Sequence, residues 1–156
     1  MMAINLVSID ASTKKTGISH FLDGEYTNHY LLDYSKIKDI ENRFESMSIG
    51  IWNILDKIRP NIIYIEETYM HNNAQTMKIL TRLQGVVYAW CINNGCKFNT
   101  ITPKAWRKLL NFNQSKETKR EQAKFQSIEY VKNNYDLNVS DDEADAICIS
   151  AAICRL

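Results

Sequence analysis

The first third of the chain contains short apolar segments whose spacing predicts β-strands. Residues 4–10 form an apolar run that ends in Asp10, which is typical of a buried strand. Residues 16–22 and 25–33 predict two further strands, and Asp23-Gly24 between them favours a tight hairpin turn. The chain is therefore expected to begin with three antiparallel strands.

From residue 36 onward, apolar residues recur at steps of three and four in several segments, which predicts helices separated by short strands. Pro60 and Gly95 fit as helix stops, and Ser140 fits as the first residue of a capping box. The expected helices cover 36–58, 74–93, a segment beginning at Thr102-Pro103, 117–134 and about 140–154, and the expected strands cover 61–66 and 97–101.

The order of these elements predicts an α/β fold with one five-stranded mixed sheet flanked by helices. The strands over 4–10, 61–66 and 97–101 are expected to be parallel, because right-handed crossovers would connect them. A chain of 156 residues fits one domain with a sizeable core, so we expect a single domain over residues 1–156.

Four acidic residues lie where such a sheet would bring them together. Asp10 and Glu66 close two apolar strands, and Asp142 and Asp145 lie one helical turn apart at the start of the last helix. Buried carboxylates need a cationic partner, and Mg²⁺ prefers oxygen ligands. We therefore expect the four side chains to hold Mg²⁺ ions that act on a phosphodiester. Glu67 lies on the opposite face of its strand from Glu66, so only one of the two can join Asp10.

Some of these acids also have a purely structural interpretation. Asp142 could simply complement the helix dipole, and Asp10 could stabilise a turn together with Ser12 and Thr13. The spacing of Asp10, Thr13 and Gly17 also resembles the phosphate loop of actin-like nucleotide-binding proteins. That fold needs two lobes, for which 156 residues are too few.

Charge is unevenly distributed along the chain, although the formal net charge is only +1. Residues 97–132 contain nine Lys and Arg against three Asp and Glu, whereas residues 133–156 contain one Arg and five acids. A basic segment followed by an acidic one suits an enzyme that holds both phosphates and metal ions. The alternative for any single lysine is a position on a solvated helix face.

The remaining composition is that of a globular protein. The four cysteines, Cys91, Cys96, Cys148 and Cys154, form no CxxC pair, so we expect buried free thiols rather than a metal site. No apolar stretch approaches the length of a membrane span, and no signal peptide precedes the first strand. We therefore expect a cytoplasmic protein without a membrane partner.

Taken together, three of these segments resemble the RuvC family of Holliday junction resolvases, within the ribonuclease H-like superfamily. Ile9-Asp10 is similar to the family's first-strand aspartate motif. The segment from Ile65 to Met70, followed by Asn73-Ala74, is similar to its second motif, and the segment from Asp142 to Ile147 is similar to its closing motif. The order and spacing of the three motifs fit across nearly the whole chain.

This resemblance implies a ribonuclease H-like fold and a crossover junction endodeoxyribonuclease. The enzyme would be a homodimer that binds branched DNA, nicks opposing strands of a four-way junction and uses two Mg²⁺ ions per active site, with Mn²⁺ as a substitute. The implied metal ligands are Asp10, Glu66, Asp142 and Asp145, and Lys119 is implied as a further catalytic residue. The residues expected to contact DNA are Tyr69, Lys104, Arg107, Lys108, Lys119 and Arg120.

Several alternatives stay open at this stage. A related nuclease could act on RNA–DNA hybrids or flaps, and a module that binds branched DNA without cutting it could contain the same acids. The helix over 74–93 could form a two-fold interface or could pack centrally within one subunit. The abundance of Ile, Asn and Lys fits a low-GC bacterium or a phage, in which case the location is the host cytoplasm.

Overall fold

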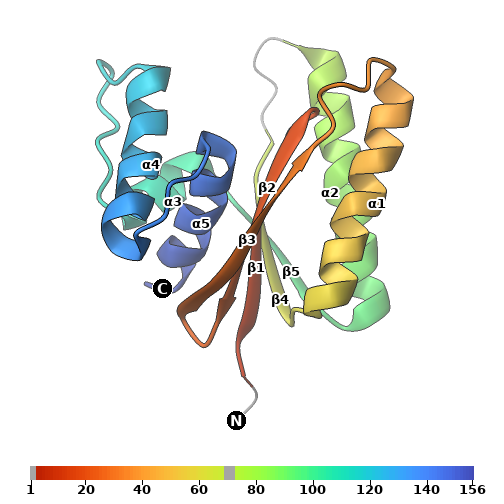
Figure 1. Cartoon of the computed structure of the whole chain (residues 1–156), viewed down its shortest axis with the longest axis horizontal. Helices are drawn as coiled ribbons and strands as arrows, with labels where there is room; N and C mark the ends of the chain where they lie inside the picture. The colour runs from red at the N-terminus through yellow and green to blue at the C-terminus, as the bar shows by residue number, and fades with distance from the viewer. Residues whose placement is uncertain (1–2, 69–72) are drawn as a thin grey trace.

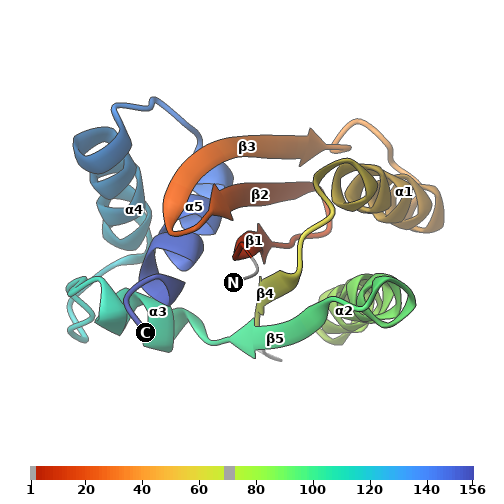
Figure 2. The ribbon, with the colours of Figure 1, turned by 90° about the horizontal axis from the view of Figure 1, so that it is seen from below.

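A computed structural model describes residues 3–68 and 73–156 of the chain. Its five strands form one mixed sheet in the order β3-β2-β1-β4-β5, which Figure 2 shows from below. The pairs β1–β2 and β2–β3 are antiparallel, whereas β1–β4 and β4–β5 are parallel, as predicted. The strands are β1 (Asn5–Asp10), β2 (Lys15–Leu22), β3 (Glu25–Asp33), β4 (Ile62–Glu66) and β5 (Lys97–Ile101).

Helices cover both faces of this sheet, so the structure has three layers (Figure 1). One face carries α1 (Ile40–Ile58) and α2 (Ala74–Asn94). The other face carries α3 (Pro103–Leu109), α4 (Arg120–Tyr135) and α5 (Asp141–Ile153). Within the described ranges, no helix is both long enough and apolar enough to cross a lipid bilayer.

Each face of the sheet has its own hydrophobic core, and strand alternation decides which side chains join it. In β1, Val7 and Ile9 belong to the buried cluster under α1 and α2, whereas Leu6 belongs to the cluster under α3, α4 and α5. Since successive side chains of a strand alternate, Asp10 shares the face of Leu6. The same alternation in β4 places Glu66 on the face of Ile62 and Tyr64, which also pack against the second cluster.

Local sequence signals explain most of the turns and helix ends. Asp23 and Gly24 both adopt positive φ angles, 51° and 83°, as a tight hairpin turn requires. Gly95 ends α2 in the left-handed conformation, Thr102 caps α3 and Ser140 forms the predicted capping box of α5.

Two helix starts differ from the prediction. The first helix begins at residue 40 rather than 36, because the Asp39 side chain accepts a hydrogen bond from the Asn42 amide at 2.9 Å and caps the helix there. The fourth helix begins at residue 120 rather than 117, because Gln122 accepts from the Lys119 amide at 2.9 Å and closes the N-terminus. The expectation of four buried thiols was wrong for Cys154, which is exposed near the end of the described chain.

Candidate metal and DNA site

The four acids that the sequence singled out line one cavity of about 440 Å³ at the carboxyl edge of the parallel strands. Asp10 and Glu66 come from the ends of the neighbouring strands β1 and β4, and Asp142 and Asp145 come from the first turns of α5. The lining residues are Asp10, Ser12, Glu66, Arg107, Thr118, Lys119, Arg120, Ala123, Lys124, Asp141, Asp142 and Asp145. The structure therefore brings residues from three distant parts of the chain to one place.

A glycine allows the start of α5 to approach the sheet closely. Gly17 in β2 pairs with Asp10 in β1, and a Cβ atom at Gly17 would lie 2.1 Å from the backbone oxygen of Asp142. Real side chains do not tolerate such an approach, so only glycine permits α5 to begin at this position. The first turn of the helix is thereby held beside the strand end that carries Asp10.

Buried serines fasten the rest of α5 to the sheet. The Ser19 hydroxyl of β2 donates to the Ala146 carbonyl at 2.7 Å and lies 2.8 Å from the Ser150 hydroxyl. Ser150 in turn donates to the Ser8 hydroxyl of β1 at 2.7 Å. All three serines are fully buried, so this network fixes how far α5 can slide along the sheet.

Burial raises the pKa of the four candidate ligands at this cavity. Burial, together with the nearby carboxylates of Glu66, Asp145 and Asp142, raises the pKa of Asp10 well above its usual range. Burial and the charge of Glu66 raise the pKa of Asp145 to about 7. Burial also raises the pKa of Glu66 and Asp142. Such shifts are expected where carboxylates gather around a place for a cation.

A buried tryptophan orients Glu66. The indole N–H of Trp106 donates to Glu66 Oε2 at 2.8 Å, and Trp106 itself is fully buried. The sequence did not reveal this partner, which lies 40 residues away along the chain. The pairing of β4 with β5 could have indicated this contact. It places Glu66 beside Ile101, and the helix that contains Trp106 starts two residues after Ile101.

The neighbouring Glu67 points to the other side of the sheet, as strand alternation predicts. Its Oε1 lies 3.5 Å from the side-chain amide of Gln84, which belongs to α2. Glu66 is therefore the acid of this pair that reaches the cavity, and Glu67 is not among the lining residues.

The turn after β1 is stabilised by Ser12, whose hydroxyl accepts a hydrogen bond from the Lys15 amide at 3.0 Å, so Asp10 is free for another role.

The basic residues that were expected to contact DNA divide into two groups. Arg107, Lys119 and Arg120 line the cavity, whereas Lys104 and Lys108 are exposed on α3 and do not line it. Lys124 also lines the cavity and forms an ion pair with Asp141 at 2.9 Å, which the sequence did not suggest. Tyr69, the remaining predicted DNA contact, lies outside the described residues.

The donor set of the cavity fits a hard cation, although no cation cage is preformed. Among residues 3–68 and 73–156, no three His, Cys, Asp or Glu side chains are gathered tightly enough to hold a metal ion as they stand. Asp145 Oδ1 is nevertheless buried without a hydrogen-bond partner, and such an oxygen is stabilised when a cation occupies the cavity. The Nε of Arg107 is likewise buried and unpaired, which provides a donor for an anionic oxygen.

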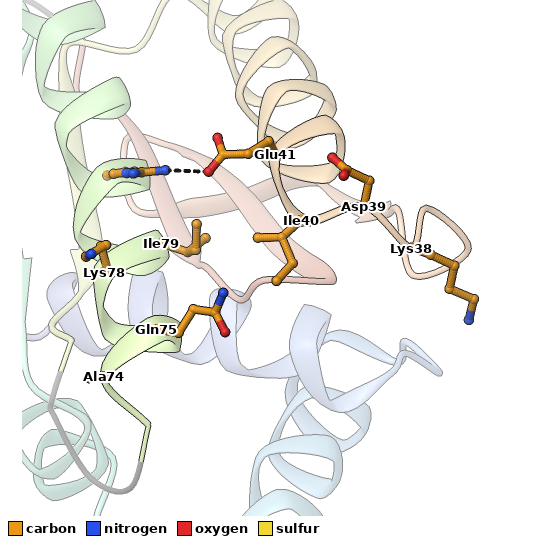
Figure 3. Close-up of a pocket in the computed structure, with 9 residues that line it drawn as sticks. Lys38, Asp39, Ile40, Glu41, Ala74, Gln75, Lys78 and Ile79 are labelled. Carbon is orange, nitrogen blue, oxygen red and sulfur yellow. Dashed lines mark hydrogen bonds and ion pairs between the residues drawn. The ribbon is translucent and has the colours of Figure 1, made fainter.

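A larger hollow of about 650 Å³ lies between the N-termini of α1 and α2, and its chemistry is different (Figure 3). Arg82 and Glu41 form an ion pair of 3.0 Å across it, so much of its charge is already balanced. Its described lining is Lys38, Asp39, Ile40, Glu41, Ala74, Gln75, Lys78, Ile79 and Arg82. Its two acids are already engaged, because Glu41 pairs with Arg82 and Asp39 caps α1, so size alone does not identify the site.

The sequence matches one protein family over almost its whole length. The family model described as crossover junction endodeoxyribonuclease RuvC matches residues 6–155. A curated relative, crossover junction endodeoxyribonuclease RuvC of Caldanaerobacter subterraneus subsp. tengcongensis, is 24% identical over 114 residues, which cover 72% of this chain and 67% of the relative.

Solved structures show the same fold at low sequence identity. Thermus thermophilus RuvC, in complex with a Holliday junction substrate, has a TM-score of 0.71 at 14% identity and covers 97% of this chain and 92% of its own. The yeast mitochondrial Holliday junction resolvase Ydc2 has a TM-score of 0.63 at 17% identity, covering 96% and 77%. The Fowlpox virus resolvase, solved with Holliday junction DNA, has a TM-score of 0.63 at 13% identity, covering 96% of each chain. These likenesses establish the fold, a five-stranded mixed sheet with flanking helices.

Proposed function

This chain belongs to the RuvC family of crossover junction endodeoxyribonucleases, and we propose that the acidic cavity between β1, β4 and α5 is its active site. The family's activity is the endonucleolytic resolution of DNA junctions. The proposal concerns the catalytic residues, the cofactor and the oligomeric state of this chain. In this proposal, four carboxylates hold divalent metal ions against the scissile phosphate of branched DNA.

One observation carries the proposal. Asp10, Glu66, Asp142 and Asp145 come from three separate elements and line a single cavity that also contains basic side chains. Purely structural acids would be paired locally, whereas the pKa of Asp10 is raised by burial and by three of its acidic neighbours. A cluster that is unfavourable without a cation is well explained by binding one.

The expected cofactor is Mg²⁺, two ions per site, with Mn²⁺ as a substitute, because the candidate ligands are carboxylate oxygens. Ions held there would supply the chemistry that turns water into a nucleophile and stabilises a leaving oxygen. Asp10 would hold these ions together with Glu66, Asp142 and Asp145, whose charges all raise the pKa of Asp10.

The protein's own contribution is to place and neutralise the phosphate. Lys119 and Arg107 line the same cavity as the acids, where they can balance the charge that develops on the phosphate oxygens. Arg107 is held over the Trp106 ring, with its guanidinium carbon 5.0 Å from the ring centroid. Arg120 also lines the cavity, and the exposed Lys104 and Lys108 would contact more distant phosphates.

The proposal includes a homodimer formed through the outer face of α2. One side of α2 packs within the subunit, since Val87 and Trp90 are buried in the core. The opposite side exposes Ile92 and Tyr88, 70% and 49% accessible, and a Cβ at Gly85 would meet nothing within 4 Å. An exposed apolar helix face of this kind is suited to pairing with its own copy. Two such subunits would cut opposing strands of a junction.

The test is a cleavage assay with a mobile four-way junction, a flap, an RNA–DNA hybrid and a plain duplex, each with and without Mg²⁺. We expect Mg²⁺-dependent nicking of the junction, loss of nicking by orders of magnitude in Asp10→Asn, and retained junction binding. Asp136→Asn is the matched control, because Asp136 is exposed and pairs only with Lys132. Preferred cleavage of the RNA–DNA hybrid or the flap would show that this nucleic acid, rather than the four-way junction, is the substrate. Junction binding without any cleavage would identify a non-catalytic module.

A further inference from the structure

Trp106 occupies an unusual place, because its apolar body is anchored in the core while its single polar atom reaches the candidate site. The residue is fully buried in the cluster beneath α3, α4 and α5. Its ring meets the Phe112 ring edge-on, with the two centroids 5.8 Å apart. A packed indole of this kind has little freedom to rotate, so its N–H points in one direction.

That direction is fixed toward Glu66. The Trp106 Nε1 donates to Glu66 Oε2 at 2.8 Å, a short bond from a rigid donor to a charged acceptor. The position follows from the topology, since Glu66 pairs with Ile101 at the edge of the sheet and α3 starts immediately beyond. An ionised carboxylate has two oxygens, so the bond uses Oε2 and leaves Oε1 for another partner.

The indole also supports the basic side of the cavity. The Arg107 guanidinium lies over the Trp106 ring, and the Nε of Arg107 is buried without a partner. Trp106 thus contacts one acid and one base of the same cavity, both of which line it.

We propose that Trp106 is a positioning residue of the metal site, whose indole N–H sets the orientation of the Glu66 carboxylate and directs its second oxygen to the cation. The inference rests on the proposed function, because it assumes that Glu66 is a metal ligand. Groups that orient a ligand in this way typically change metal affinity about 10-fold to 100-fold when removed. Trp106→Phe keeps most of the apolar body and removes only the donor.

The chain offers a matched control for this substitution. Trp90 is also a buried tryptophan whose indole N–H donates to a carboxylate, Asp56 Oδ1, at 2.9 Å, but it lies in the cluster on the opposite face of the sheet. In the DNA-free protein, Mn²⁺ binding measured by electron paramagnetic resonance should weaken about 10-fold or more in Trp106→Phe. Binding in Trp90→Phe should equal that of the wild type. Raising the Mg²⁺ concentration should restore cleavage by Trp106→Phe, as expected for a lost orientation rather than a lost ligand.

A second measurement uses the unmodified protein and so does not depend on how the variant folds. The indole N–H groups of Trp52, Trp90 and Trp106 donate to Val86 O, Asp56 Oδ1 and Glu66 Oε2, respectively. On addition of Mg²⁺, the Trp106 indole resonance should shift while the other two stay in place.

The outcomes separate this inference from the proposed function. The positioning role alone would be overturned if the wild type and Trp106→Phe bound Mn²⁺ with equal affinity. It would also be overturned if the Trp106 indole resonance did not shift as the metal binds. Equal weakening in both tryptophan variants would also overturn it, since general destabilisation would then explain the loss. Absence of Mn²⁺ binding in the wild type would instead overturn the proposed metal site.

Discussion

Replacing Asp145 by Asn should stabilise the metal-free protein while abolishing its activity. The pKa of Asp145 is raised from the ordinary 3.8 to about 7, first by burial and then by the charge of Glu66. Since each pKa unit corresponds to about 1.4 kcal/mol, ionised Asp145 destabilises the folded state by at most about 4 kcal/mol. The repulsion is shared among several acids, so we expect about 2 kcal/mol to be regained by the neutral amide.

The effect must depend on pH with a definite sign. The folded-state pKa lies above the unfolded one, so the penalty is absent below about pH 4 and grows as the pH rises to about 7. Thermal unfolding followed by circular dichroism in EDTA should therefore show a melting temperature about 4–8 °C higher for Asp145→Asn at pH 8. The gap should close toward pH 4. Saturating Mg²⁺ should raise the melting temperature of the wild type and leave that of the variant unchanged.

The exposed Asp136→Asn serves as control and should not reproduce the gain in melting temperature at pH 8. A destabilising carboxylate charge at Asp145 is refuted if Asp145→Asn is less stable than the wild type at pH 8. It is also refuted if the difference is the same at both pH values, because the carboxylate charge would then not be its cause.

Three further predictions follow from the same structure. Gly17→Ala should destabilise the protein by about 2 kcal/mol and slow cleavage, because the new Cβ would lie 2.1 Å from Asp142 O and push the start of α5 away; unchanged melting and cleavage would contradict the close approach. Ile92→Glu should convert dimers to monomers in light scattering and paired cuts to single nicks on a cruciform plasmid; a persistent dimer would exclude the outer face of α2 as the interface. Lys119→Ala should lower the cleavage rate at a saturating junction concentration, whereas Lys108→Ala should mainly weaken junction binding and reduce the salt dependence of binding by about one counterion. Equal effects of the two substitutions on the cleavage rate would contradict the different positions of the two lysines.

The parts of the fold that depend on local interactions could be predicted from the sequence. Asp23-Gly24, Thr102-Pro103 and Ser140 each mark a turn or a helix start through contacts within a few residues, and all three lie where expected. Strand alternation also predicted that only one of Glu66 and Glu67 could join Asp10, and in the structure Glu66 is the one that lines the cavity. The start of the first helix was misjudged because the apolar spacing continues to residue 37, whereas Asp39 caps the helix after that point.

The parts that depend on long-range packing could not be predicted. Nothing near Trp106 in the sequence indicates that its indole will donate to Glu66, because the contact depends on the pairing of β4 with β5. The role of Gly17 is equally hidden, since a glycine after a turn looks like a turn residue until α5 is placed against it. Sequence reasoning located the acids, but the supporting residues became visible only in three dimensions.

The most direct test of the metal site is a crystal structure of the protein soaked with Mn²⁺, with anomalous difference density calculated. We predict a peak inside the cavity, about 2 Å from carboxylate oxygens of Asp10 and Glu66 and of at least one of Asp142 and Asp145. An empty cavity at saturating Mn²⁺, or an ion bound only elsewhere on the protein, would contradict the account.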